Sequence, residues 1–427
     1  MKSTTQDLQI LEDIFEQFYP VGATSLGGVT RLGYSPEEDE MHAIFRQIAE
    51  EEGFQTYVDE VGNTYAANEA GSPSANCEYY LIGSHLDSVV DGGRYDGVAG
   101  IIAGLMVMKW LKEQSIQLPL RVVAFRCEES SNFGRCTIGS GLITKRIGKP
   151  QVECLTAKDG SSFAQIFKER GLSMDPKKIA DVKQYLELHI EQGKVLEEYG
   201  MKVGIVTNIA GPRRFNVHIH GEAEHSGATP MNMRSDALCA AAEFILEVER
   251  IGKDESHRDS VATVGVIDAR PNVLNVTPGE VTLGVDLRGI DDDSLELMEK
   301  RMREATRYIS AKRHIPFFVE KTSAATPIEL DRGMQKKLIE CAERLRVTYK
   351  VMPSGAGHDA MAFAEITRAA MVFIPCCKGV SHNRGEFTSL ESIYDGARVI
   401  YEYLKEEGKS YDPGEKREGD RPEDKAG

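Results

Sequence analysis

The strongest constraint on the fold is a run of three apolar segments between residues 79 and 127. Tyr79–Ile82 is short, aromatic and branched, which predicts a buried strand. Val98–Leu111 is apolar nearly all round and predicts a buried helix, and Leu120–Cys127 predicts a second buried strand. Polar residues follow both strands. This pattern is typical of an α/β sheet whose carboxyl edge carries a functional site.

The polar residues after the first strand are of the kind that binds metals. They lie in Gly83-Ser84-His85-Leu86-Asp87-Ser88 and Gly92-Gly93-Arg94-Tyr95-Asp96-Gly97. Because residues two apart share a face of an extended chain, Asp87 could hold the imidazole of His85, as carboxylates do behind metal-bound histidines. The glycines allow the chain to fold back and bring Asp96 to the same place. A single His-x-Asp is more often an ordinary polar loop, so this hypothesis needs partners elsewhere in the chain.

Such partners stand at three other strand ends. Glu128 and Glu129 follow the second buried strand, and because consecutive side chains of an extended segment point apart, they should have different roles. His189 lies in the apolar strand Tyr185–Ile190, where alone it would be a core histidine, and His382 follows another buried strand. Imidazole and carboxylate ligands suit zinc, manganese, cobalt or nickel. A bridging carboxylate with further ligands on each side would form a two-metal site that activates water and leaves one glutamate as general base.

The middle of the chain follows a different pattern. Residues 213–328 run strand, helix, two strands, helix, strand, which is the ferredoxin-like order. We therefore predict an α/β catalytic domain with a central mixed sheet flanked by helices, interrupted by an inserted ferredoxin-like α+β domain. The catalytic domain would comprise residues 1–212 and 329–407. Residues 408–427, rich in Lys, Glu, Asp, Pro and Gly, predict a disordered tail.

Composition argues against several classes of partner. The chain has 51 basic and 67 acidic residues, and its net charge of -16 disfavours binding to nucleic acid or anionic lipid. No stretch is apolar for long enough to span a membrane, and no basic segment followed by an apolar run suggests a signal peptide. Eight cysteines without regular spacing are typical of thiols in a reducing compartment, so a cytoplasmic protein is expected.

Five motifs together resemble those of the M20 metallopeptidase clan. They are His85-Leu86-Asp87, Gly92-Gly93-Arg94-Tyr95-Asp96-Gly97, Glu128-Glu129, Leu188-His189-Ile190-Glu191-Gln192-Gly193 and Ser381-His382-Asn383. The set looks most like the amidase branch, which holds N-carbamoyl-L-amino-acid hydrolases, allantoate amidohydrolases and β-ureidopropionases. The resemblance runs in order over almost the whole chain.

The resemblance implies two divalent metal ions per chain and a role for each motif residue. One ion would be bound by His85 and His189 and the other by Glu129 and His382, with Asp96 bridging them. Glu128 would be the general base and then the acid, and Asp87 would orient His85. The inserted domain would be a lid and dimerisation domain, so a homodimer is expected.

The resemblance also implies the residues that bind substrate. Gln192 lies beside the His189 ligand, and His225, in Glu224-His225-Ser226-Gly227-Ala228-Thr229-Pro230, would help to polarise the scissile carbonyl. Asn275 and Arg288 would bind a substrate carboxylate, although a surface salt bridge is the alternative for Arg288. Backbone groups of Gly355 and Ala356 would complete the pocket.

Two motifs depart from the family pattern near the expected pocket rim. Ser130-Ser131-Asn132 replaces the common Gly-Ser-Arg after the glutamate pair, and Arg384-Gly385 replaces Pro-Ala after Ser-His-Asn. Neither change removes a ligand, so both bear on the substrate and not on the chemistry.

The expected activity is hydrolysis of a linear amide or ureido C–N bond in a small molecule with a free carboxylate. An N-carbamoyl-L-amino acid is the first expectation, giving the L-amino acid, ammonia and carbon dioxide. Allantoate is the alternative, because Gly27-Gly28-Val29-Thr30-Arg31-Leu32 and Tyr34-Ser35-Pro36 resemble that subgroup. An M20-type N-acyl-amino-acid hydrolase or peptidase and a catalytically dead binding protein are further alternatives; the complete ligand set and Glu128 argue against the last.

Overall fold

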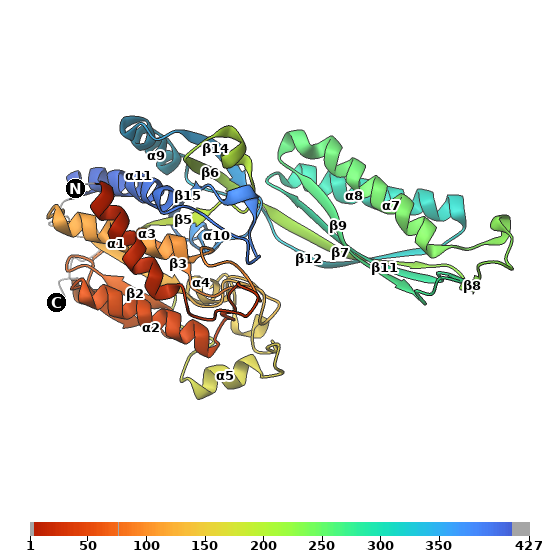
Figure 1. The fold of residues 1–427 in the computed structure, drawn as a ribbon, viewed down its shortest axis with the longest axis horizontal. Helices are drawn as coiled ribbons and strands as arrows, with labels where there is room; N and C mark the ends of the chain where they lie inside the picture. Colours follow the sequence, from red (N-terminus) through yellow and green to blue (C-terminus); the bar gives the residue numbers. More distant parts are fainter. Residues whose placement is uncertain (1–3, 76, 412–427) are drawn as a thin grey trace, which may run out of the picture. The chain divides into compact units, whose positions relative to one another are not determined.

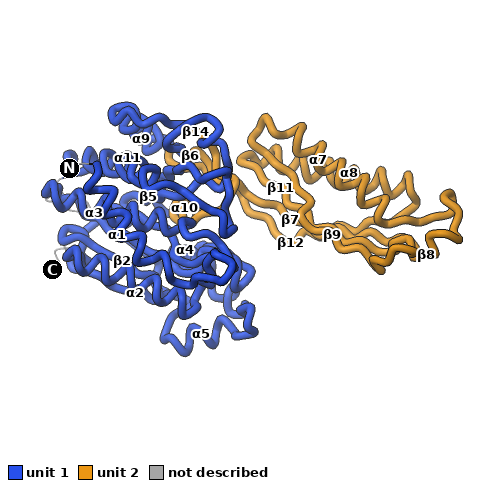
Figure 2. Tube along the Cα trace, viewed as in Figure 1, with its two compact units in different colours: residues 1–205, 332–350, 365–427 blue, residues 206–331, 351–364 orange. Residues whose placement is uncertain are grey.

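The computed structural model describes residues 4–75 and 77–411 (Figure 1). The chain divides into two compact units: unit 1 comprises residues 1–205, 332–350 and 365–427, and unit 2 comprises residues 206–331 and 351–364 (Figure 2). Unit 2 includes all of residues 213–328, the predicted inserted domain. In the predicted tail, residues 412–427 lie outside the described part, and the first two residues are helical because α11 (Leu390–Lys409) continues through them.

Unit 1 is built on a mixed sheet, as predicted. The strand order is β1 (Gln55–Val58), β2 (Thr64–Ala67), β4 (Leu120–Phe125), β3 (Tyr79–His85), β5 (Val182–Ile190) and β15 (Arg368–Ile374), after which β6 (Val203–Ile209) pairs through Gly204 and Ile205. The β3–β4, β3–β5 and β5–β15 pairs are parallel. Because parallel strands end at one edge of a sheet, the polar residues that follow them are brought together there.

Helices flank this sheet, and the longer ones contribute residues to its apolar core. They are α1 (Thr4–Phe18), α2 (Pro36–Glu51), α3 (Val98–Glu113), α4 (Ile138–Thr144), α5 (Phe163–Glu169), α6 (Val195–Tyr199), α9 (Arg332–Leu345) and α11. Helix α3 is buried nearly all round, as its apolar sequence predicts. Helix α2 starts at a capped turn typical of its sequence: Glu38 N–H donates to Ser35 Oγ at 3.3 Å, and Pro36 occupies the first turn.

Unit 2 contains the ferredoxin-like arrangement. Its main elements are β7 (Gly211–His220), α7 (Ala237–Glu255), β9 (Val261–Arg270), β11 (Glu280–Gly289), α8 (Asp292–Arg313) and β12 (Phe317–Ala324). The sheet order β12-β7-β11-β9 is antiparallel throughout. Phe215, Val217 and Ile219 point into the core of this unit, as their alternation predicts.

Shorter elements complete the two units. They are β8 (Glu224–His225), β10 (Val276–Thr277), β13 (Ile328–Glu329), β14 (Tyr349–Ser354), α10 (Ala360–Ala364) and short 3-10 turns at Pro73–Ala75, Lys149–Gln151, Met231–Met233, Ser256–Arg258 and Cys377–Gly379. Just before β10 the chain makes a turn, in which Val276 N–H donates back to Val273 O at 3.2 Å. In the described part of the chain, no helix combines the length and the apolarity that crossing a membrane requires.

Candidate metal centre

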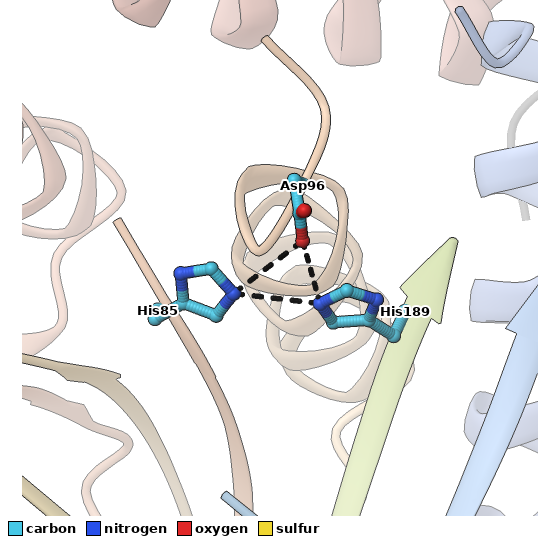
Figure 3. A group of neighbouring side chains, drawn as sticks. All are labelled: His85, Asp96 and His189. Atoms are coloured by element: carbon cyan, nitrogen blue, oxygen red, sulfur yellow. Dashed lines mark hydrogen bonds and ion pairs between the residues drawn. The ribbon is translucent and has the colours of Figure 1, made fainter. Parts of the chain in front are cut away.

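Three buried side chains from separate elements of unit 1 converge at the carboxyl edge of the sheet (Figure 3). His85 ends β3, His189 lies near the end of β5, and Asp96 stands just before α3. The Asp96 Oδ1 atom lies 2.9 Å from His189 Nε2 and 3.5 Å from His85 Nε2, and the two Nε2 atoms are 3.4 Å apart. Gly97 allows this approach, because its φ is 69° and a Cβ there would lie 2.4 Å from the carbonyl oxygen of His85.

The donor atoms of this group fit a metal ion. His189 Nδ1 faces Ile190 O at 3.0 Å, and His85 Nδ1 faces Asp87 O at 3.2 Å. With the proton on Nδ1, each ring would offer the lone pair of its Nε2 to an ion. The carboxylate of Asp96 is buried, and its Oδ1 faces both Nε2 atoms. A point equidistant from the three atoms lies about 1.9 Å from each, close to a zinc–nitrogen bond of ~2.0 Å.

The titration of these groups also favours positive charge at this place. Burial opposes protonation of His85, but hydrogen bonds from its ring to Asp87 and Asp96 raise its pKa well above the usual value. Burial likewise opposes protonation of His189, and the negative charge of Asp96 raises its pKa. Burial would raise the pKa of Asp96, yet the histidines hold it well below its ordinary value. A divalent cation would take the place of these protons.

A second group shares Asp96 through its other oxygen. His382 Nε2 lies 3.0 Å from Glu129 Oε1 and 3.3 Å from Asp96 Oδ2. Hydrogen bonds to Asp96 and Glu129 raise the pKa of His382 to about 10. Gln192 Nε2 lies 3.0 Å from Asp96 Oδ2 and 3.1 Å from His382 Nε2, so its amide contacts the same atoms. The structure thus brings together all five predicted ligands, and Asp96 is common to the two groups.

Asp87 holds the two glutamates as well as the histidine. Its Oδ1 and Oδ2 accept the N–H groups of Glu128 and Glu129, both at 3.0 Å, while Oδ1 lies 3.3 Å from His85 Nδ1. Glu128 Oε2 lies 4.0 Å from His85 Nε2, and Glu128 belongs to neither candidate group. Its carboxylate therefore lies beside the centre in a place where a general base could accept a proton from water.

Two further carboxylates near the centre, Glu386 and Glu38, were not predicted from the sequence. Glu386 accepts the N–H groups of Tyr95 and Asp96 at 2.9 and 3.0 Å. Glu38, in the first turn of α2, is fully buried and accepts Cys127 N–H at 2.8 Å. Neither has a local sequence signal, because both act on loops far away in the chain.

In unit 2, Arg288 is oriented by two acceptors. Its Nε and Nη2 lie 3.1 and 3.0 Å from Asp286 Oδ2, and its Nη1 donates to Gly355 O at 2.8 Å. The salt bridge considered as the alternative is therefore present. A guanidinium has five N–H groups, so two remain available for a substrate carboxylate. Ala356 N–H is directed to Ser354 Oγ at 3.2 Å.

The other two predicted lid residues lie together but far from Arg288. His225 pairs with Val276 in the β8–β10 ladder, and Ser226 N–H donates to Asn275 O at 2.9 Å. Figure 1 shows β8 at the end of this unit's sheet where β11 begins. Arg288 lies eight residues after Glu280 in β11, about 26 Å along an extended strand. One small molecule cannot contact both ends of a single unit 2.

Comparisons with known proteins show which family the chain belongs to. The profile of peptidase family M20/M25/M40 matches residues 81–406. An N-carbamoyl-L-amino-acid amidohydrolase of Pseudomonas sp. (strain NS671) is 35% identical over 415 residues, 95% of this chain and 99% of that protein. An allantoate amidohydrolase of Escherichia coli (strain K12) is 35% identical over 403 residues, 92% and 96% of the two chains.

A solved structure of an amidase is similar to this chain over nearly its whole length. The crystal structure of an amidase of the hydantoinase/carbamoylase family from Burkholderia multivorans superimposes with a TM-score of 0.87 at 31% identity, covering 94% of this chain and 98% of that one. The chain therefore belongs to the M20/M25/M40 peptidase family. Within that family it is an amidohydrolase that acts on C–N bonds of linear amides other than peptide bonds.

Proposed function

We propose that this enzyme hydrolyses N-carbamoyl-L-amino acids to the L-amino acid, ammonia and carbon dioxide. The observation that carries the proposal is the position of Glu128, a carboxylate outside both ligand groups but 4.0 Å from one of their ligand atoms. Two ligand groups that share Asp96, with a further carboxylate beside them, are the arrangement that two-metal hydrolases use. The Pseudomonas relative named for this activity supports the choice of substrate.

Each residue has a defined part in the proposed reaction. Two divalent ions, when bound, would lower the pKa of a water molecule and polarise the carbamoyl carbonyl. Glu128 takes the proton from the attacking water and later gives it to the leaving nitrogen, while Asp87 holds the backbone of Glu128 in place. His225 donates to the carbonyl oxygen as negative charge develops there. The two remaining N–H groups of Arg288, with Asn275, bind the substrate carboxylate.

The proposal includes a homodimer formed through unit 2. Strand β9 is an edge of its sheet, ten residues long, and exposes Val266 and Ile267 by 60% and 54%. An unprotected apolar edge is a surface that pairs readily with a second copy. Because Arg288 lies about 26 Å along β11 from the end of the sheet at which His225 lies, a second chain would have to supply one of these two residues to each site. Sedimentation of the wild type and of Ile267→Glu tests this, and a wild-type monomer would contradict it.

A cytoplasmic location is part of the same proposal. All eight cysteines are free thiols in the structure, which suits a reducing compartment. Thiol titration of the denatured, unreduced protein purified from cells should find eight reactive groups, and a disulfide would argue against this location.

Allantoate is the second candidate substrate, and one contact favours it. The segment that resembles the allantoate subgroup lies directly against the loop that carries Asp96: Val29 N–H donates to Gly92 O at 3.0 Å, and Gly92 N–H donates to Val29 O at 2.8 Å. Arg31 N–H also donates to Ser88 Oγ at 3.0 Å. The Escherichia coli relative is as similar to this chain as the Pseudomonas one.

A substrate panel decides between these candidates. The metal-stripped enzyme is supplied with manganese, cobalt, nickel or zinc and assayed on N-carbamoyl amino acids, allantoate, N-acyl amino acids and dipeptides. Ammonia release reports the first two classes, and amine release reports all but allantoate. Preference for an N-acyl amino acid or a dipeptide would overturn the proposal.

Glu128→Gln tests the mechanism. We expect this variant to keep the metal content of the wild type and to lose about 10²–10⁴-fold in kcat, because an amide cannot accept the proton. Glu129→Gln is the contrast, since it removes a ligand and should lower metal content. Near-normal turnover by Glu128→Gln would exclude Glu128 as the general base.

A further inference from the structure

We propose that Glu386 is a positioning residue that ties Asp96 to the loop of His382 and thereby secures the more exposed of the two candidate metal sites. The inference rests on the proposed two-metal function and concerns the binding of the second ion. It assigns a role to a residue outside the ligand set.

Glu386 makes three hydrogen bonds to two different loops. Its Oε1 accepts the N–H groups of Tyr95 and Asp96, at 2.9 and 3.0 Å. Its Oε2 lies 3.0 Å from Ser381 Oγ, and the same hydroxyl lies 3.1 Å from Asp96 Oδ2. One buried carboxylate thus holds the backbone of the bridging ligand and contacts the neighbour of His382.

The two candidate sites differ in how their ligands are supported. His85 and His189 belong to the central strands β3 and β5, where sheet hydrogen bonds set the backbone, and both are buried. His382 belongs to a loop, has a φ of 55°, and its side chain is 49% exposed. Glu386 closes that loop, because its own N–H donates to Asn383 O at 3.0 Å. The second site therefore depends on contacts such as those of Glu386.

The loop that carries Asp96 is shaped around Glu386. A Cβ atom on Gly93 would lie 2.0 Å from the Glu386 carboxyl carbon, so no larger residue fits there while the carboxylate keeps its place. This close approach accounts for Gly93 in the Gly92-Gly93-Arg94-Tyr95-Asp96-Gly97 motif.

The buried negative charge of Glu386 would be compensated by groups at the candidate metal centre. Within the described part of the chain, Glu386 forms no ion pair with a lysine or arginine, whereas the buried Glu38 is paired with Arg126 at 2.9 Å. A buried carboxylate is costly unless hydrogen bonds or nearby positive charge compensate it. Three hydrogen bonds and a divalent ion at Asp96 would provide that compensation.

Metal-binding measurements on three variants test the proposal. The variants are Glu386→Ala, Glu386→Gln and Ser381→Ala, and elemental analysis after dialysis at graded free manganese or zinc gives the ions bound per chain and both dissociation constants. In Glu386→Ala we expect the tighter ion to stay and the Kd of the weaker one to rise about 10–100-fold, the usual effect of losing a residue that supports ligands. Glu386→Gln should lose less affinity for the weaker ion, because its amide oxygen can still accept the N–H groups of Tyr95 and Asp96.

Glu407→Gln is the matched control. Glu407 is also a buried glutamate with side-chain donors, accepting Tyr80 Oη at 3.0 Å and Gln184 Nε2 at 3.1 Å. Tyr80 lies five residues before His85 in β3, so this network is about 16 Å from the centre. We expect lower thermal stability in this variant with both metal affinities unchanged.

The outcomes separate this inference from the proposed function. A wild-type chain that binds fewer than two ions overturns the two-metal function, and with it this inference. If the wild type binds two ions, two results overturn only the role of Glu386. One is an equal loss of affinity for both ions in Glu386→Ala, and the other is an unchanged affinity for the second ion. Should Glu386→Ala fail to fold, the same comparison in Ser381→Ala and Glu386→Gln decides, because each of these variants keeps a side-chain oxygen that accepts the N–H groups of Tyr95 and Asp96.

Discussion

Replacing Asp87 by asparagine probes the contact on which the geometry of both glutamates depends. Asp87 is 1% exposed and has three donors around it: His85 Nδ1 and Glu128 N–H at Oδ1, and Glu129 N–H at Oδ2. An asparagine oxygen can replace only one carboxylate oxygen. It will take the Oδ1 position, where two donors converge, and so its NH₂ group will face the N–H of Glu129.

The cost of Asp87→Asn follows from these contacts. A hydrogen bond to a charged acceptor contributes about 1.5–3 kcal/mol, and a buried N–H without an acceptor costs about 1–3 kcal/mol. Since the two terms overlap, we expect the free energy of unfolding to fall by roughly 2–4 kcal/mol. Displacement of the Glu129 backbone should also raise the Kd of the metal ion at Glu129 and His382 about 10–100-fold.

Urea denaturation of the metal-stripped protein measures the first effect, and metal titration measures the second. The free-energy difference comes from the shift in midpoint at an unchanged slope. Asp7→Asn is the control: Asp7 is 1% exposed, and among residues 4–75 and 77–411 its only side-chain donor is Trp110 Nε1 at 3.2 Å, which an asparagine oxygen can still accept. A stability for Asp87→Asn equal to that of the control, or an unchanged metal affinity, would refute the reasoning.

Three further predictions follow from the same contacts. Gly93→Ala should weaken the second metal ion as Glu386→Ala does, because its methyl carbon would lie 2.0 Å from the Glu386 carboxyl carbon; normal metal titration would contradict this. Arg288→Ala should raise KM about 10–100-fold with less change in kcat, the loss expected for a charge-assisted hydrogen bond. In initial-rate kinetics, the KM of Arg288→Lys should lie between those of the wild type and Arg288→Ala. An unchanged KM in Arg288→Ala would exclude binding of the substrate carboxylate by Arg288. Asp96 and Glu129 raise the pKa of His382 from 6.5 to about 10. The interaction of protonated His382 with these carboxylates therefore stabilises the metal-stripped fold fully below pH 6.5, and this stabilisation is lost as the pH rises towards 10. The Tm of the stripped protein should therefore fall across that interval, and His382→Asn should lack this part of the fall.

Much of the architecture could be predicted from local patterns. The apolar run of β3, the all-apolar face of α3 and the Ser35 cap of α2 each depend on residues within a few positions of one another. Alternation in β7 and the order of elements in unit 2 were enough to indicate the ferredoxin-like domain. The sequence by itself also indicated the five candidate ligands. His85, Glu129 and His189 stand at the ends of buried strands, glycines allow the chain to bring Asp96 back to the same place, and His382 follows a further buried strand.

Only the tertiary structure decided how those residues are held and which of them can act together. Glu386 meets the N–H of Asp96 across 290 positions of the chain, and no local period or motif reports a contact that depends on packing between distant loops. The same is true of Asp87, whose two oxygens accept the N–H groups of Glu128 and Glu129 some forty residues later. Conversely, the length of β11 separates His225 from Arg288, which the motifs alone had placed around one substrate. Local propensity sets the elements, whereas register and loop closure set the distances between their ends, and the chemistry depends on those distances.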